Sequence, residues 1–246
     1  MSAKGIWVNV PAYDGNVRVG TAHSLNVETY AAINAGIPFM VHFHEQDPIL
    51  PRCRNSMIMK FLDSDPAAFT DMVFVDADVG FPSGALIRLA SHDADIVGAV
   101  YPYRKDPIQF PVQLKNGCRV DERGLLEVQG VPAGCMRVSR RALETMIAKF
   151  PGLEYIEDKV PQGKAYALFD YVRKNRVFSG EDFVFCAIAR EAGFKIYADV
   201  GITLEHVGMK KFIGCMADAL PPEVRYDPMA AIYDFNKMVA EAECRN

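Results

Sequence analysis

Short apolar runs alternate with segments of helical periodicity along the front of the chain, and this alternation constrains the fold more than any other feature. Apolar runs at 6–10, 39–43, 72–75 and 96–101 have the length of buried strands. Helical spacing fills the intervals at 24–35, 54–62 and 82–90. Strands that alternate with helices form βαβ units, whose sheets are parallel and covered on both faces. The sequence therefore predicts an α/β fold with a mainly parallel central sheet flanked by helices.

The pattern changes beyond residue 108. Short β-like pieces at 112–114 and 125–128 alternate with glycines and favour antiparallel hairpins. Helices are predicted at 140–149 and 181–192, strands at 195–198 and 202–205, and an amphipathic helix at 229–242. We predict a single domain over 1–246, divided into a front half (1–108), a smaller antiparallel and irregular rear half (109–210) and a C-terminal tail (211–246).

Composition excludes several classes of protein. The 246 residues include 27 basic and 31 acidic side chains, with no long basic stripe, so no nucleic-acid partner is expected. There is no apolar run long enough to cross a bilayer and no N-terminal targeting pattern, so we expect no transmembrane segment and a cytoplasmic location. The six cysteines are widely spread, which favours free and mostly buried thiols over a zinc site or a disulfide framework.

The stretch MVFVDADV places two carboxylates, Asp76 and Asp78, at the end of the third predicted strand. In an extended chain, side chains two positions apart face the same side, so both carboxylates are expected at one spot, with Ala77 pointing away. Ligands of open α/β sheets bind beyond the carboxyl ends of the strands, and two carboxylates suit Mg²⁺ or Mn²⁺. Ordinary turn chemistry explains the same pair, so the motif alone leaves both interpretations open.

Further candidate residues follow the D-x-D motif, most of them in the rear half. Gly180 precedes Glu181 and Asp182 at the start of a predicted helix, where acidic side chains either answer the helix dipole or serve a cleft. His206 ends a strand as a core histidine or a metal ligand. The segment GAVYPYRKDP either faces a ligand or forms a solvated loop, and the glycines at 130 and 134 allow a close backbone approach. The irregular stretch 151–179 is interpreted as a lid or acceptor loop.

Taken in order, these motifs resemble the GT-A class of nucleotide-sugar glycosyltransferases, of the family 2 type. The resemblance rests on Asp76-Ala77-Asp78, on ALIRLASHDADIVGAVY and VPAGCMRVSRRALE, on Gly180-Glu181-Asp182 with FCAIAREAGFKIYAD, and on His206, and it spans about 6–208. It implies a Rossmann-like GT-A fold with a nucleotide-sugar-binding front half and an acceptor-side rear half.

The resemblance also implies roles for individual residues. Asp78 and His206 would ligate Mn²⁺ or Mg²⁺, and Asp76 would contact the donor ribose or the metal. Asp182 would act on the acceptor side with Glu181 as its neighbour. The donor nucleotide would be held by a further set of residues: Pro11, Tyr13, Asp14, Arg52 and Arg54. The second strand departs from the family pattern by ending in FHEQD, which leaves Glu45 and Asp47 without an assigned role.

The resulting hypothesis is a metal-dependent transferase that moves a sugar from a UDP- or GDP-sugar to a glycan or another hydroxyl acceptor. A cation would offset the charge on the departing nucleoside diphosphate, and Asp182 would accept the acceptor proton in an inverting reaction. The sequence does not choose between inversion and retention. Two alternatives stay open: a haloacid-dehalogenase-like phosphatase with Asp76 as nucleophile, and a non-catalytic sugar-nucleotide or glycan-binding module of the same fold.

Overall fold

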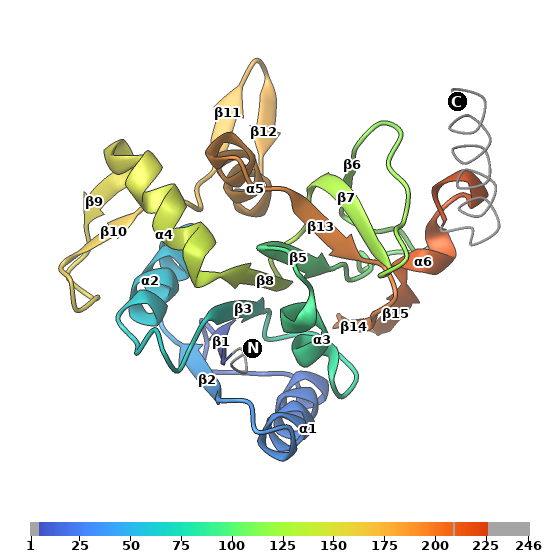
Figure 1. The fold of residues 1–246 in the computed structure, drawn as a ribbon, viewed down its shortest axis with the longest axis horizontal. Coiled ribbons are helices and arrows are strands. Elements are labelled where there is room, and N and C mark those ends of the chain that lie inside the picture. The colour runs from blue at the N-terminus through green and yellow to red at the C-terminus, as the bar shows by residue number, and fades with distance from the viewer. Residues whose placement is uncertain (1–4, 209, 226–246) are drawn as a thin grey trace, which may run out of the picture.

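A computed structural model of the chain, which describes residues 5–208 and 210–225, has an eight-stranded sheet with helices on both faces (Figure 1). The strands lie in the order β2 (Phe39–His44), β1 (Ile6–Pro11), β3 (Asp71–Val75), β8 (Cys135–Ser139), β5 (Ile96–Ala99), β13 (Ile196–Asp199), β7 (Leu125–Gly130) and β6 (Gln113–Leu114). Strands β8 and β7 run against the others, and the remaining six of the eight share one direction. The predicted mainly parallel α/β sheet is confirmed.

Two apolar clusters fix the helices against the sheet. Along β3, Met72 and Phe74 pack in one cluster with α2 (Leu50–Leu62), α4 (Arg140–Lys149) and α5 (Glu181–Ala192). The alternate residues Val73 and Val75 pack in the other cluster with α1 (Val19–Asn34) and α3 (Ala85–Ser91). Since both faces are covered, β3 is buried at every position and reads in the sequence as a continuous apolar run.

Small antiparallel units are present, as predicted for the fold, but not where they were expected: the pieces at 112–114 and 125–128 pair antiparallel as β6 and β7 inside the central sheet, and 151–179 is not irregular. A three-stranded sheet joins β4 (Val79–Gly80), β14 (Thr203–Val207) and β15 (Lys211–Cys215). Two hairpins fill the stretch predicted as a lid or acceptor loop: β9–β10 (Glu154–Ile156 and Lys164–Tyr166) and β11–β12 (Val172–Lys174 and Val177–Ser179). The short helix α6 (Met216–Ala219) and 3-10 turns at Pro151–Leu153 and Pro222–Val224 complete the described chain.

The predicted helix boundaries agree best with the structure where a capping residue marks the end of the helix. Helix α4 begins after Ser139, whose hydroxyl accepts a hydrogen bond from the Ala142 amide, and α5 ends at Gly193 in the left-handed region. The expected start of α1 at Ser24 is wrong by five residues, because Ser24 is not a cap: its hydroxyl donates to Phe81 O and accepts from Phe81 N. The predicted helix at 229–242 lies outside the described residues.

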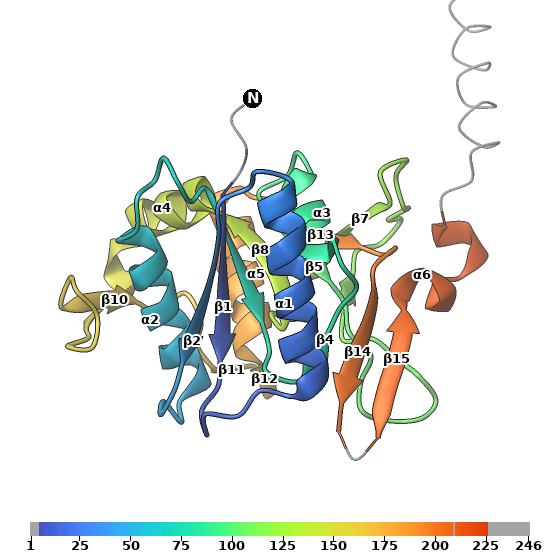
Figure 2. The same cartoon turned by 90° about the horizontal axis from the view of Figure 1, so that it is seen from below.

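The topology places the ends of two strands side by side. Strands β1 and β3 are adjacent and parallel, so their carboxyl ends reach the same edge of the sheet (Figure 2). The loop that follows β1 is tied to the segment that follows β3 by a 2.8 Å hydrogen bond from Arg18 N to Ala77 O. This edge carries the candidate site.

Candidate active site

Arg54 lies at the centre of the charged groups at this edge. Its side chain, from α2, is 2% exposed, and it donates to Asp76 Oδ1 at 2.8 Å and to Glu181 Oε1 at 2.9 Å. The guanidinium also lies 5.7 Å from the Phe74 ring centroid and 5.5 Å from that of Phe169. Burial alone would lower its pKa, but the adjacent carboxylates outweigh burial and raise the pKa of Arg54. A permanent positive charge therefore joins the end of β3 to the start of α5.

The two aspartates of the D-x-D motif do not share one extended stretch. Ala77 and Asp78 form a turn, closed by a 3.1 Å hydrogen bond from Val79 N to Asp76 O. The expectation that alternation aims both carboxylates at one spot is therefore wrong. Asp76 is held by Arg54, whereas Asp78 pairs with Arg104 and approaches His206. The turn separates the motif into two neighbouring charge pairs, and this relieves the repulsion that an extended D-x-D would create.

Asp78 and His206 each direct a hydrogen-bond acceptor atom toward the other. His206 Nε2 is 3.7 Å from Asp78 Oδ1, and His206 Nδ1 is 2.8 Å from the carbonyl oxygen of Pro102. A carbonyl oxygen only accepts, so Nδ1 carries the proton of the ring. Burial lowers the pKa of His206, which leaves the ring neutral near neutral pH with a lone pair on Nε2. Strand pairing keeps the two residues in place, since Val207 N donates to Asp78 O at 3.0 Å.

This donor set fits a divalent cation. A carboxylate oxygen and an imidazole nitrogen that face each other are suitable ligands for Mn²⁺, and Mg²⁺ takes one or two carboxylates with phosphate and water oxygens. Over residues 5–208 and 210–225 there is no cluster of three or more His, Cys, Asp or Glu side chains able to hold a metal ion. Asp78 and His206 are therefore a pair of possible ligands, and any further ligand to a cation at this place would have to come from a bound molecule or from water.

The side chain of Arg104 lies beside Asp78, where a bound cation would lie. It forms an ion pair with Asp78 Oδ2, and its side chain lies so close to Gly208 that a β-carbon added there would meet Arg104 Cδ at 2.9 Å. The guanidinium therefore takes one of the two oxygens that a metal would use. The segment around Tyr101 to Lys105 thus faces the site at Arg104, as one of its two sequence interpretations predicts.

Tyr101 and Gly134 form the wall between the two carboxylate groups. The Tyr101 ring lies 4.6 Å from that of His206, centroid to centroid. Burial, followed by the charges of Asp76 and Asp182, raises the pKa of Tyr101 well above its ordinary value. A β-carbon at Gly134 would lie 2.5 Å from both Asp76 Oδ2 and Tyr101 Cε1, so only glycine fits. The close approach expected at Gly134 is thus made by the side chains of Asp76 and Tyr101, and the contact of the Tyr101 ring with His206 has no signal in the sequence.

The two acidic residues at the start of α5 differ in burial and in their hydrogen-bond partners. Glu181 is buried and bound by Arg54, and burial is the main cause that raises its pKa. Asp182 is partly exposed, and its Oδ2 accepts a 3.4 Å hydrogen bond from Ala133 N beside Gly134. Of the two carboxylates, Asp182 is the one that a bound molecule could reach.

The residues predicted to hold a nucleotide separate into two groups. Tyr13 and Asp14 lie after β1 and line a surface pocket of about 520 Å³, together with Gly15, Glu45, Gln46 and Pro48. Pro11, the last residue of β1, pairs with His44 of β2. Arg52 instead forms a 2.8 Å ion pair with Asp47, whose other contacts include Ile49 N at 3.0 Å. A contact of these residues with nucleotide stays a prediction.

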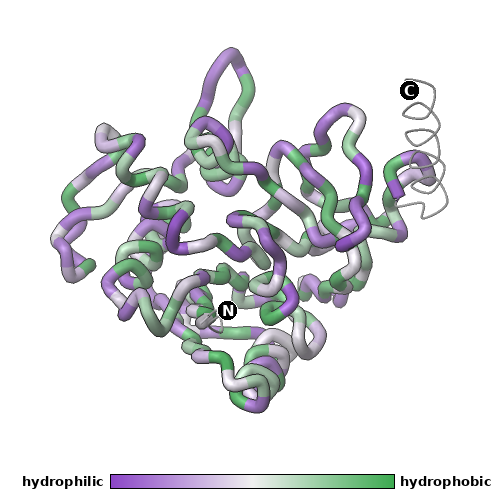
Figure 3. Tube along the Cα trace, in the orientation of Figure 1, coloured by the Kyte–Doolittle hydropathy of each residue, from purple (hydrophilic) through white to green (hydrophobic). Residues whose placement is uncertain are grey.

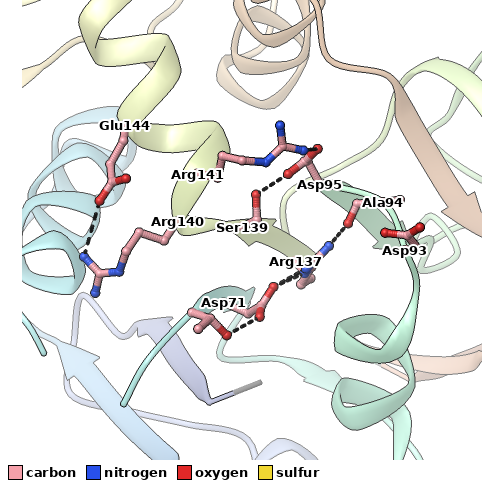
Figure 4. Close-up of a pocket in the computed structure, with 10 residues that line it drawn as sticks. Asp71, Asp93, Ala94, Asp95, Arg137, Ser139, Arg140, Arg141 and Glu144 are labelled. Carbon is pink, nitrogen blue, oxygen red and sulfur yellow. Dashed lines mark hydrogen bonds and ion pairs between the residues drawn. The ribbon is translucent and has the colours of Figure 1, made fainter. Parts of the chain in front are cut away.

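A second charged pocket, of about 580 Å³, lies where β3 begins and β8 ends, at the opposite edge of the sheet (Figure 4). Most of its charges have a partner among the lining residues or in the helices beside them. Arg137 pairs with Asp71 inside the protein, and Asp95 accepts from Ser139 Oγ at 2.6 Å and pairs with Arg141. Arg140 donates to the last carbonyls of α2. This pocket is a structural network rather than a second candidate site.

No family model and no curated protein matches the sequence. Among solved structures, the chain is similar to A197 from STIV, at 17% identity and a TM-score of 0.50, over 83% of this chain and 86% of that one. It is also similar to the catalytic domain of Drosophila β1,4-galactosyltransferase 7 in complex with xylobiose (12% identity, TM-score 0.44, 80% of this chain and 65% of that one). A second structure of that galactosyltransferase contains manganese, UDP-Gal and xylobiose.

A glycosyltransferase involved in glycosylation of the major capsid of PBCV-1 is similar over 57% of this chain and 62% of that one, at 15% identity and a TM-score of 0.33. The chain thus spans less than two thirds of either glycosyltransferase. Within the described residues, no helix is both long and apolar enough to cross a membrane. The likeness is one of fold: the match to A197, at a TM-score of 0.50 over 83% of this chain, agrees with the predicted Rossmann-like α/β fold.

Proposed function

We propose that the protein is a metal-dependent glycosyltransferase that moves a sugar from a nucleoside-diphosphate donor to a hydroxyl acceptor. The observation that carries the proposal is the facing pair Asp78 Oδ1 and His206 Nε2, at the carboxyl edge of the central sheet and adjacent to the Asp76–Arg54–Glu181 network. A UDP- or GDP-sugar is the expected donor. A cytoplasmic location is part of the proposal, supported by free thiols at all five cysteines of the described chain.

Each residue of the site has a separate task in this reaction. Asp78 and His206 would hold Mn²⁺ or Mg²⁺, which would offset the charge of the diphosphate when bound. Asp76, held still by Arg54, would accept from a donor hydroxyl. Arg104 is released from Asp78 if a metal binds there, and it would then pair with a donor phosphate. Tyr101 and Gly134 exclude water between the two halves of the site.

The chemical step is a displacement at the anomeric carbon of the donor sugar. The bond from that carbon to the diphosphate oxygen breaks, its electron pair leaves with the diphosphate, and a bond to the acceptor oxygen forms. For an inverting reaction, Asp182 would take the proton of the acceptor hydroxyl, because it is the more accessible acid of the pair. Glu181 is less suited to this task, since Arg54 already occupies it.

Donor hydrolysis without acceptor tests the proposal. We expect slow release of UDP or GDP from one member of a nucleotide-sugar panel, with Mn²⁺ or Mg²⁺ required. Hydrolysis of a generic phosphate ester, with beryllofluoride trapped on Asp76, would support a phosphatase instead. Donor binding without hydrolysis or transfer across the panel would indicate a binding module.

Asp182→Asn separates binding from chemistry. The variant should bind nucleotide and metal as the wild type does, because the carboxylate makes only one long hydrogen bond in the site. Transfer should fall by about 10²-fold or more if Asp182 is the general base. Asp158→Asn, an exposed aspartate in the β9–β10 hairpin, is the control and should be unchanged. Normal turnover in Asp182→Asn would remove this residue from the mechanism.

A further inference from the structure

The β11–β12 hairpin projects from the body of the protein beside the start of α5 (Figure 1). Residues 170–178 are all exposed, and the two turn residues Asn175 and Arg176 have φ values of 51° and 66°. An isolated two-stranded hairpin is marginally stable in water and usually needs a third strand or a packed face. This hairpin has neither along its length, so its exposed side chains are available to a ligand.

One face of the hairpin is an aromatic platform. Arg173 is paired with Phe178 across the strands, and Tyr171 precedes them on the same face. The Tyr171 and Phe178 rings are stacked, with centroids 5.7 Å apart and an interplanar angle of 26°. They are 47% and 65% exposed, and because they are in contact they form one contiguous apolar patch, the kind of surface that often marks a binding site. A flat aromatic surface of this kind suits the C–H face of a sugar ring.

The same hairpin is strongly positive. Its strands and turn carry Arg173, Lys174 and Arg176, between Asp170 on one side and Glu181 and Asp182 on the other, although the chain as a whole has a net charge of −4. Lys174 pairs with Val177 on the face opposite the rings. The ion pairs of the described chain involve none of these three cations. Figure 3 shows hydrophilic and hydrophobic positions together along this hairpin. The surface therefore complements a ligand that is both ring-shaped and anionic.

The base of the hairpin is fixed to the candidate active site. Asn55, next to Arg54, donates to Phe169 O at 2.9 Å and accepts from Phe169 N at 2.9 Å. The Phe169 ring stacks on Phe185 of α5 at 4.5 Å. The hairpin then runs directly into Glu181, whose charge, after burial, raises the pKa of Tyr171. The platform is thus held at a defined place next to the acid pair.

We propose that the β11–β12 hairpin is the acceptor subsite and that it takes an anionic glycan, with a sugar ring on Tyr171 and Phe178 and its acidic groups against Arg173, on the same face, and Arg176, in the turn. The inference rests on the proposed function, because it assigns an acceptor to that site. A glycan fits better than an anionic membrane surface, since the platform is joined to Asp182, where an acceptor hydroxyl must lose its proton.

Binding of short oligosaccharides tests the proposal by calorimetry. The probes are uronate-containing, sulfated and phosphorylated oligosaccharides, each with a neutral counterpart of equal length. The wild type should bind at least one anionic probe about tenfold more tightly than its counterpart, a size that a few exposed charge pairs supply. Replacing Arg173 and Arg176 with glutamine should remove that preference, and Phe178→Ala should weaken both probes. The control, Arg119→Gln with Lys159→Gln, changes two exposed cations elsewhere and should have no effect.

Several outcomes would overturn the inference: equal affinity for charged and neutral probes, no saccharide binding at all, or binding to phosphatidylserine vesicles in place of saccharides. Binding of UDP with Mn²⁺, measured on the same variants, separates this inference from the proposed function. Nucleotide binding without a charge preference refutes the acceptor assignment alone. A charge preference without nucleotide binding leaves a glycan site on the hairpin and refutes the transferase.

Discussion

At the scale of single residues, the buried charge of Arg54 organises the candidate site. It is the one cation that contacts both Asp76, at the end of β3, and Glu181, at the start of α5, among the described residues. Its Nε has no hydrogen-bond partner in that part of the chain, so the two carboxylates carry most of the compensation for its burial. Arg54 therefore acts on a ligand through the carboxylates that it positions.

Arg54→Met should destabilise the protein strongly. Removing one partner of a buried ion pair leaves the other charge uncompensated, which costs about 3–5 kcal/mol. Urea unfolding gives the loss as a change in the free energy of unfolding. Arg123→Met is the matched control, because Arg123 pairs with Asp121 at the surface, where an ion pair contributes less than about 1 kcal/mol. Equal effects of the two substitutions would show that Arg54 has no special role in the fold.

Arg104 makes a different prediction, because it competes with a metal for Asp78. Arg104→Ala should strengthen Mn²⁺ binding in the absence of nucleotide, by about fivefold, since a partly exposed ion pair is worth up to about 1 kcal/mol. Calorimetric titration with Mn²⁺ alone measures this change. Lys105→Ala removes a cation from the same loop that lies over Tyr103 and should leave the affinity unchanged. Weaker Mn²⁺ binding in Arg104→Ala would mean that Arg104 orders the site.

At the scale of elements, the sequence predicts what local chemistry determines. The front βαβ units, α4 and α5 follow from apolar period, a serine cap and a terminal glycine. Strand β8, in the middle of the sheet, was not predicted. It is buried at every position, so it shows no alternation, and its central residue is Arg137, which looks unsuited to a core until its pairing with Asp71 of β3 is known.

In the candidate site, too, the sequence predicts only what local chemistry determines. Asp78 and His206 come together because β4 pairs with β14, and Asp76 meets Glu181 only through Arg54. The sequence identifies these residues by type and order. It does not show that a turn after Asp76 divides the D-x-D motif, because that turn depends on the hydrogen bond from Val79 and on the pairing of β4.

Asp199 connects strand β13 to helix α3 through an ion pair. At the end of β13 it is fully buried, and it binds Arg88 of α3 at 2.6 Å and His92 at 2.8 Å. Burial raises the pKa of Asp199, but hydrogen bonds from His92 and Arg88 outweigh burial, and the net pKa is lowered. A carboxylate whose pKa is lower in the folded state stabilises the fold above its unfolded pKa, and that stability is lost as the pH falls through the folded pKa.

Asp199→Asn should therefore unfold at lower urea than the wild type near neutral pH. The difference should begin to shrink as the pH falls below about 4, where the carboxyl of the unfolded wild type takes up a proton, and it should go on shrinking until the folded carboxyl, whose pKa is lower, is protonated too. Urea denaturation at a series of pH values measures both changes. A difference that stays constant through the acid range would show that the charge of Asp199 is not what holds α3.

At the scale of the whole molecule, the sheet separates two charged regions with different roles. The edge where β3 begins is closed by ion pairs that satisfy one another, as around Arg137 and Asp95. The edge where β3 ends keeps acceptors that face each other, at Asp78 and His206. Only the second edge brings a carboxylate oxygen and an imidazole nitrogen face to face at the carboxyl ends of the strands, and this is the reason that we place the donor there.

Calorimetric titration of UDP and GDP, with and without Mn²⁺, tests the central claim most directly when the wild type is compared with Asp78→Asn. We predict that the wild type binds one of the two nucleotides much more tightly with Mn²⁺, that Asp78→Asn loses this gain, and that Asp158→Asn keeps it. Metal-dependent nucleotide binding that is the same in Asp78→Asn and the wild type would contradict the account.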